Sequence, residues 1–389
     1  MMNFGNKISI LLLPYLMVFA SLADAQDSSS ARLFYAENDL PGAFKSINHY
    51  CDQKGNEEAG AWLLKARILT AISSNSRLTG FLTDGYKQAF DALKKAVQLD
   101  KQLIVDSFHL NNTILWQLYN GIMDLGVTSF NAGMENRNNE NYLEALQQFK
   151  YANSMAGYFY EQGWGGSRLD TNSLYKGALA AIHAEKDMDA LLFCRRIADA
   201  GMVEDHLGKG YEPVYDWLSY YYKKAKDSLL FFHYTEIGTR FYPLSSYFER
   251  MKIDWYRTEN NIPACFPIYR SILFKEPENM AFLQAYLADI NSFCTNASYP
   301  AEAFKQLTKE FEMRVNQLMH IIPGPGMIFL TAGRFLYNQS LITLPGTKRN
   351  ALQAKAIFFL NYVLQKKTDA NKDIILQAKE LKTKIHLGR

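Results

Sequence analysis

A ladder of small and large apolar residues, recurring at helical spacing, constrains this chain more than any other feature. In the segment NYLEALQQFKYANSM, which begins at Asn141, the residues Ala145, Phe149 and Ala152 follow one another at intervals of four and three. This spacing places all three side chains on one face of an α-helix. Alanine lets two helix backbones approach closely, and phenylalanine fills the space beside them. The segment therefore predicts one helix of a closely packed pair.

Five further copies of this ladder lie along the chain. They are Ala43, Ile47 and Tyr50; Ala89, Leu93 and Ala96; Ala190, Cys194 and Ile197; Leu229, His233 and Glu236; and Ala264, Ile268 and Ser271, the last closed by Pro277. Each follows a segment that fits a partner helix, such as TNSLYKGALAAIHAEK with Leu174, Ala178 and Ala181 on one face. A single pair cannot bury its apolar face, so recurring pairs predict an all-α solenoid of stacked antiparallel helix pairs.

The chain resembles the tetratricopeptide repeat family in three features: the second-helix ladders, the small residues Ala31 and Ala178 in first helices, and the closing Pro277. The resemblance covers residues 27 to 365. It implies a right-handed superhelix whose first helices line a groove for a peptide or a folded partner. Successive ladders begin 46 and 56 residues apart at Ala43, Ala89 and Ala145, against a family period of about 34. The repeats are therefore degenerate, and an array broken into two stacks or a generic α-solenoid is an alternative.

The connections between ladders suggest a domain organisation. Residues 73–85 and 157–170, the latter with the sequence GYFYEQGWGGSRLD, are rich in glycine and polar residues and are predicted to lengthen connections, where repeat proteins commonly add binding elements. Residues 323–326 break the helical pattern before a final pair at 328–342 and 350–365 and a capping helix at 373–384. The expected parts are N-terminal repeats at 26–156, a connecting loop at 157–170, central repeats at 171–322, and a C-terminal pair with its cap at 327–389.

Residues 1–25 have the pattern of a secretory signal peptide. Lys7 precedes an apolar stretch from Ile8 to Ala20, and the small residues of SLADA predict cleavage after Ala25. The stretch is shorter than the roughly 20 residues that span a bilayer, although a retained anchor is the alternative reading. No cysteine lies near the cleavage site, so lipid attachment at a new N-terminal cysteine is not expected. We expect a periplasmic or secreted protein of a Gram-negative bacterium that does not span the membrane after signal removal.

Charge argues against a nucleic-acid partner. The chain has 42 Lys and Arg against 39 Asp and Glu, interspersed along its length. Binding to a row of phosphates requires a concentrated basic patch. A protein or peptide partner is expected instead.

No catalytic or metal-binding motif stands out. The cysteines Cys51, Cys194, Cys265 and Cys294 lack the paired short spacing of a zinc site, so buried thiols are expected, with a Cys265–Cys294 disulfide as the alternative. His233 and Glu236 are three residues apart on a predicted helix, but two ligands do not make a metal site. Neither a cofactor nor a metal is expected, and a non-enzymatic protein is favoured over an enzyme with carboxylates paired only in space.

The segment from Tyr211 to Tyr256 is unusually aromatic, with 15 of its 46 residues being Phe, Tyr or Trp. Consecutive residues on a helix point about 100° apart, so at least one of three adjacent tyrosines should reach the surface. Core packing would explain most of these rings; a binding surface would explain the rest. The predicted partner-binding residues are Trp217, Tyr220, Tyr221, Tyr222, Phe232 and Tyr234. Two functions remain open: a protein-interaction scaffold of the cell envelope, and capture of a glycan or peptide by residues 211–256.

Overall fold

The computed structural model describes residues 28–53, 57–78, 80–101, 108–165, 167–205, 208, 210–296, 301–318, 326–343, 345–365 and 370–387. Within these residues the chain is helical, and the isolated bridge between Glu204 and Gly210 is the one β-type pairing described. The predicted all-α class is confirmed. The predicted signal segment, 1–25, lies outside the described residues.

The chain divides into two compact units, Met1–Val214 and Tyr215–Arg389. The predicted connecting loop at 157–170 does not coincide with this division, because the two helices that follow the loop belong to unit 1. The predicted loop also begins too early. Its first residues, 157–161, continue the preceding helix to Glu161 before the turn at Gly163.

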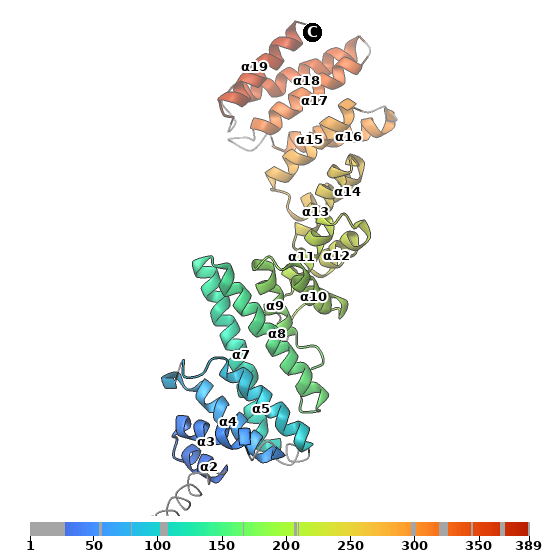
Figure 1. The fold of residues 1–389 in the computed structure, drawn as a ribbon. Helices are drawn as coiled ribbons and strands as arrows, with labels where there is room; N and C mark the ends of the chain where they lie inside the picture. Colours follow the sequence, from blue (N-terminus) through green and yellow to red (C-terminus); the bar gives the residue numbers. More distant parts are fainter. Residues whose placement is uncertain are drawn as a thin grey trace, which may run out of the picture. The chain divides into compact units, whose positions relative to one another are not determined.

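Unit 1 consists of successive helices that pack in antiparallel pairs (Figure 1). They are α2 (Ser28–Ala36), α3 (Leu40–Gln53), α4 (Ala59–Ser74), the 3₁₀ turn η2 (Ser76–Leu78), α5 (Gly85–Leu99), α7 (Phe108–Asn136), α8 (Asn139–Glu161), α9 (Thr171–His183) and α10 (Asp187–Asp199). The strongest packing joins α2 to α3, α4 to α5, α7 to α8, and α9 to both α8 and α10. Helix pairing of this kind is what the sequence ladders predict.

Unit 2 continues the same pattern. Its helices are α11 (Glu212–Lys224), most of which lies in this unit, α12 (Ser228–Phe241), α13 (Tyr247–Thr258), α14 (Ile262–Lys275), α15 (Met280–Asn296), α16 (Ala301–Gln317), α17 (Gly326–Ile342), α18 (Thr347–Leu364) and α19 (Lys372–His386). From α12 onward each packs on the next, and α17 also packs on α15 and α19. A continuous apolar core runs from Ile253 to Ile385.

The turns inside the pairs repeat one backbone conformation that the sequence did not reveal. In each of six pairs, one non-glycine residue of the turn has a positive φ between 51° and 62°; these residues are Asn38, Asp84, Arg137, Glu185, Lys226 and Asn260. At four of them the following amide closes the preceding helix, as when Asp227 N donates to Tyr222 O at 3.0 Å. This left-handed termination is a common way to satisfy the last carbonyls of a helix. The recurring turn identifies the repeat unit independently of the apolar ladder.

Most of the predicted ladder positions lie in the core. The exposed fraction is 1% or less for Ala43, Ala89, Ala96, Ala145, Phe149, Ala152, Ala178 and Ala190. These faces are therefore buried within the helix packing. Pro277 follows the last residues of α14, as predicted for a residue that closes a helix.

The ladder was assigned to the wrong face in α12 and α14. Leu229 is 79% exposed and His233 and Glu236 are also exposed, whereas Phe231, Tyr234, Thr235 and Gly238 are buried. In α14 the predicted Ala264 is half-buried, and the core face begins one residue later with Cys265, Tyr269 and Ile272. Both helices carry large apolar residues on more than one face, so the apolar pattern alone does not identify the buried one.

All four cysteines are buried and free, so the alternative Cys265–Cys294 disulfide is wrong. Burial raises the pKa of the Cys51 and Cys265 thiols to about 11 and that of Cys294 to about 12. Thiols with such a pKa stay protonated at neutral pH. Among the helices described, none is both long enough and apolar enough to cross a membrane.

Candidate functional site

The aromatic segment 211–256 forms most of α11, α12 and α13, and many of its rings pack against one another. Tyr222 of α11 stacks on Tyr234 of α12, with ring centroids 5.5 Å apart. Phe231 of α12 stacks on Trp255 of α13 at 4.7 Å. Stacked and edge-on aromatic pairs add to the stabilisation given by burial. The density of rings in this segment therefore serves first to join three successive helices.

The structure separates the six predicted binding residues into three groups. Tyr222 and Tyr234 are only 6% and 2% exposed, so they pack in the core and do not offer a surface. Trp217, Tyr221 and Phe232 are half-buried; Trp217 stacks on Tyr221 at 5.1 Å, and Phe232 contacts Trp255 and Tyr256. Tyr220 is 53% exposed. Of the six, it is the one that presents most of its ring to a partner.

A second exposed tyrosine, which the sequence analysis did not select, lies near Tyr220. Tyr247 of α13 keeps 39% of its surface exposed. Partial burial, followed by the charges of Asp216 and Asp254 and the hydroxyl of Tyr220, raises the pKa of Tyr247 to about 12. Asp216, Asp254 and Tyr220 therefore each act electrostatically on the hydroxyl of Tyr247. We call Asp216, Tyr220, Tyr247 and Asp254 the α11–α13 surface.

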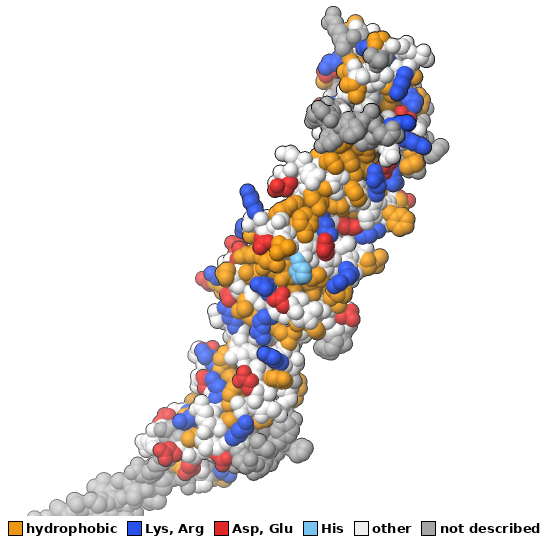
Figure 2. Space-filling view, turned by 90° about the vertical axis from the view of Figure 1, so that its right-hand side faces the viewer, with side chains coloured by type: hydrophobic (Ala, Val, Ile, Leu, Met, Phe, Trp, Pro, Cys, Tyr) orange, Lys and Arg blue, Asp and Glu red, His pale blue; other side chains and the backbone are white. Residues whose placement is uncertain are grey.

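Further exposed apolar side chains lie close in sequence to these helices. Leu244, in the turn after α12, is 95% exposed, and Phe274 at the end of α14 is 89% exposed. Figure 2 shows hydrophobic side chains gathered on one face at the height of α13, α14 and α15. Scattered exposed apolar residues are normal, but a gathering of them commonly marks an interaction surface.

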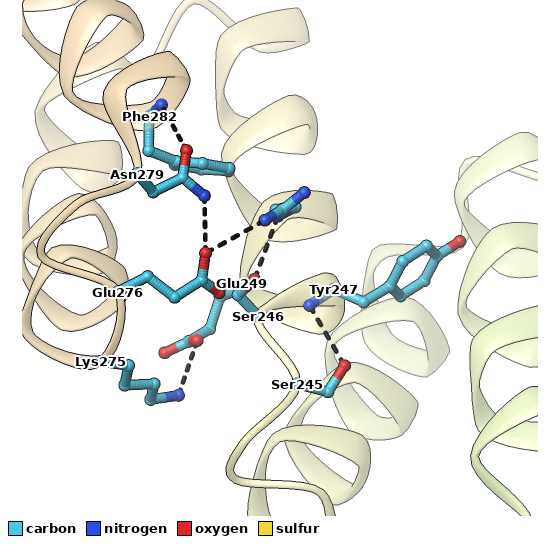
Figure 3. A network of polar contacts seen from close by, with 9 residues as sticks. Ser245, Ser246, Tyr247, Glu249, Lys275, Glu276, Asn279 and Phe282 are labelled. Atoms are coloured by element: carbon cyan, nitrogen blue, oxygen red, sulfur yellow. Dashed lines mark hydrogen bonds and ion pairs between the residues drawn. The ribbon is translucent and has the colours of Figure 1, made fainter.

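A polar network fixes α13 against the turn between α14 and α15. Arg250 donates from Nε to Ser246 Oγ at 3.1 Å and from Nη2 to Glu276 Oε2 at 3.4 Å. Asn279 Nδ2 donates to the same Glu276 oxygen at 2.6 Å. Hydrogen bonds from Ser246 and Asn279, followed by the Arg250 charge, hold the pKa of Glu276 below its ordinary value. Figure 3 shows Tyr247 pointing away from this cluster, so the network supports the tyrosine's helix without engaging its ring.

The buried carboxylates of unit 2 are occupied by structural partners. Glu249 accepts from Lys275 Nζ and from Ser271 Oγ, each at 2.7 Å. Asp289 accepts from the Tyr269 hydroxyl at 2.8 Å and from Arg257 Nε at 2.9 Å. A carboxylate held in this way stabilises the helix packing and is not placed as a free base. Across the described residues, no group of three or more His, Cys, Asp or Glu could hold a metal ion.

Unit 1 contains a cavity of about 760 Å³ between α7, α8 and the loop that leads into α9. Aromatic rings line much of it: Trp116 and Tyr119 from α7, Phe159 from α8 and Trp164 from the loop. Tyr119 donates its hydroxyl to Asp170 Oδ2 at 2.7 Å, and Trp116 is 59% exposed. We call this the α7–α9 cavity. Its volume falls within the range of ligand pockets, which bring apolar walls and a few polar groups together.

One part of this cavity, the loop that contains Trp164, was recognisable from the sequence. The Trp164-Gly165-Gly166 turn stands out, and Gly165 adopts a φ of +102° that favours glycine. Trp164 itself is 5% exposed and packs edge-on against Tyr158 at 5.9 Å. Trp116 and Tyr119 were missed, because they lie in a long apolar helix and nothing nearby in the sequence distinguishes them from core residues.

Comparisons with known proteins give low similarity throughout. No family model and no curated protein matches the chain. The P58(IPK) TPR domain covers 92% of this chain and 86% of its own length, with 12% identity and a TM-score of 0.28. Yeast Tom70 covers 93% of this chain and 88% of its own length, with 11% identity and a TM-score of 0.32. A circular tandem repeat protein covers 92% of this chain and 86% of its own length, with 12% identity and a TM-score of 0.19.

At these values the solved structures add no argument of their own. The repeat architecture is established by the chain itself: by the order of its helices, the packing of neighbours, the buried alanine ladders and the recurring left-handed turn. The chain is an all-α array of antiparallel helix pairs that is similar in kind to tetratricopeptide repeats.

Proposed function

We propose that this protein is a non-enzymatic interaction scaffold whose α11–α13 surface binds a protein or peptide. The observation that supports this most directly is the position of Tyr220 and Tyr247. Both rings are substantially exposed, yet they belong to helices held in place by stacked rings and by the Arg250 network. Rigid, exposed aromatic side chains are the residues that most often dominate binding energy at protein interfaces.

The charges around the tyrosines favour a mixed polar and apolar partner. Asp254 forms an exposed ion pair with Lys223 at 3.3 Å, and Asp216 lies close to Tyr247. Such pairs contribute little to stability in water but can orient a partner. A peptide segment with apolar side chains would complement the exposed rings of Tyr220 and Tyr247 on the α11–α13 surface.

The proposal places this scaffold in the cell envelope. Its support is the sequence of residues 1–25, with an apolar stretch and a small-residue cleavage site before Gln26. The mature chain would then meet its partner in the periplasm or outside the cell.

The decisive experiment compares two variants of the mature chain in affinity capture from native envelope extract. Tyr220→Ala/Tyr247→Ala removes both exposed rings, whereas Met188→Ala/Leu192→Ala removes two side chains of α10 that are 73% and 56% exposed. Circular dichroism first establishes that both remain helical. A partner captured by the parent and the α10 variant but lost with the tyrosine variant supports the proposal; equal capture by all three contradicts the assigned surface.

A second candidate function is capture of a glycan, which the α7–α9 cavity favours over segment 211–256. The exposed Trp116 provides a flat apolar face, while Asp170 and Asn172 line the cavity with groups that can bind hydroxyls. Screening of the parent and Trp116→Ala on glycan arrays tests this candidate. Binding that disappears with Trp116→Ala would favour it, and an array without signal would remove it.

A further inference from the structure

A different cavity lies in unit 2, between α16, α17 and α18, and it is lined by lysines. Its volume is about 730 Å³. Lys305 and Lys309 come from α16, and Lys348 and Lys355 come from α18. Glu312 is the one carboxylate among the lining residues. We call this the lysine cavity; the α7–α9 cavity, by contrast, has no Lys or Arg in its lining.

The positive charge of the lysine cavity is only partly balanced. Lys355 Nζ forms an ion pair with Glu312 at 2.8 Å, so this amine is balanced. Lys309 and Lys348 are exposed, and no ion pair to either is found within the described part of the chain. Like charges held around one cavity repel one another, and an anion placed between them relieves that repulsion.

Two further features of the lining favour an anion. Gln339 of α17 is 9% exposed, and its Nε2 donor has no acceptor within the described residues. A buried amide donor without an acceptor destabilises the fold. If the Gln339 amide rotates, an acceptor in the cavity would form the missing hydrogen bond and remove this cost. The N-terminus of α18 has no side-chain cap and no acidic residue in its first turn. Such a helix end attracts negative charge.

We propose that the lysine cavity binds the phosphate group of a phosphate monoester. Near pH 7 this group carries a charge of about −1.5 to −2, which matches the unbalanced lysines better than the single charge of a carboxylate. Ile342 and Leu352 also line the cavity and can contact the organic part of the ester. The ester could be a soluble metabolite or the headgroup of a lipid, and both present the same chemistry to the lysines.

The test measures binding of four probes to the full mature chain: inorganic phosphate, phenyl phosphate, benzoate, and phosphatidylcholine vesicles with and without phosphatidic acid. We expect phenyl phosphate to bind more tightly than benzoate, which has the same ring and a single charge. Lys309→Ala/Lys348→Ala should weaken binding by at least about tenfold, because two charges of the cavity lining are lost. The control Lys379→Ala/Lys384→Ala removes the same charge from exposed positions of α19 outside the cavity and should change affinity by less than about twofold.

The outcomes separate clearly. Binding of phenyl phosphate identifies a soluble ester as the source of the phosphate group. Binding only to vesicles with phosphatidic acid identifies a lipid headgroup as the source. Either result supports the proposal if Lys309→Ala/Lys348→Ala loses the interaction. Equal losses in the two lysine variants would show a general charge effect and overturn it. A parent chain that binds neither phenyl phosphate nor the acidic vesicles would also overturn it.

Discussion

The hydroxyl of Tyr269 in α14 donates to the carboxylate of Asp289 in α15 at 2.8 Å, and the same carboxylate accepts from Arg257 of α13. One buried acid thus links three successive helices. Replacement of Asp289 by Ala leaves the Tyr269 hydroxyl buried without its acceptor, so we expect a loss of about 2–4 kcal/mol in the free energy of unfolding. Urea denaturation followed by circular dichroism measures this change in the free energy of unfolding.

Asp254→Ala is the matched control for this prediction. Asp254 forms a single ion pair with Lys223 in which its own side chain is 59% exposed. Loss of an exposed pair should cost at most about 1 kcal/mol. If the two substitutions destabilised the chain equally, the Asp289 carboxylate would not be the link between helices that its geometry indicates.

Gly238 lies where α12 packs tightly against Phe248 of α13. A Cβ added at this position would overlap the ring of Phe248, which is fully buried. We therefore expect Gly238→Ala to destabilise the chain by about 1–3 kcal/mol through overpacking. Gly157 in α8 has no atom near the added methyl, so Gly157→Ala should stabilise by about 0.5–1 kcal/mol through helix propensity. A lower melting temperature for Gly238→Ala and a higher one for Gly157→Ala would confirm both predictions. A shift of both melting temperatures in the same direction would contradict them.

The buried thiols should give a pH-dependent signature. Burial raises the pKa of Cys51 and Cys265 to about 11, whereas an unfolded cysteine titrates near about 8.5. The folded chain retains these protons above the pH at which the unfolded chain loses them. Their contribution to stability is therefore complete below about pH 8.5 and is lost as the pH rises toward about 11.

Thiol labelling at pH 8 checks this expectation directly. The native chain should react slowly with a disulfide reagent, and the chain in guanidinium should expose all four cysteines. Labelling of the native chain at the unfolded rate would mean that the thiols are accessible and that their pKa is not raised by burial.

The turn at Lys226 should tolerate only certain residues. Its φ is +57°, a conformation that β-branched side chains disfavour strongly. We expect Lys226→Val to cost about 1–2 kcal/mol and Lys226→Gly to cost nothing. Lys224→Val, at an exposed position of the preceding helix, should cost less than about 0.7 kcal/mol. Thermal unfolding of the three variants measures the differences, and a Lys226→Val variant as stable as Lys226→Gly would contradict the left-handed geometry.

The sequence predicted the fold well where small residues appear on one face alone. In α10, Ala190, Cys194 and Ile197 are all fully buried, as their spacing predicts. In α12 the same reading failed, because Leu229 and Phe231 are both large and apolar and the spacing of neither identifies the core. Leu229 is 79% exposed while Phe231 is fully buried. Contacts with α13, through Trp255 and Phe248, decide between them, and those contacts are not local in sequence.

The candidate surface was predictable to a similar extent. Tyr220 followed from the geometry of three consecutive tyrosines, since one of them had to face outward. Tyr247 did not, because its place beside Tyr220 depends on how α13 packs after the turn at 242–246. The lysine cavity was missed for the same reason: its lysines come from two helices about 40 residues apart, and their charges are balanced in the overall composition.

The main helix contacts of the described chain join only helices that are next to one another or two places apart. Within each unit, the described helices therefore pack mainly on their near neighbours in the sequence. A substitution should therefore lower hydrogen-exchange protection in its own pair and the adjacent ones and leave distant pairs unchanged. The same arrangement lets such a protein gain or lose whole helix pairs during evolution without redesign of the pairs that remain.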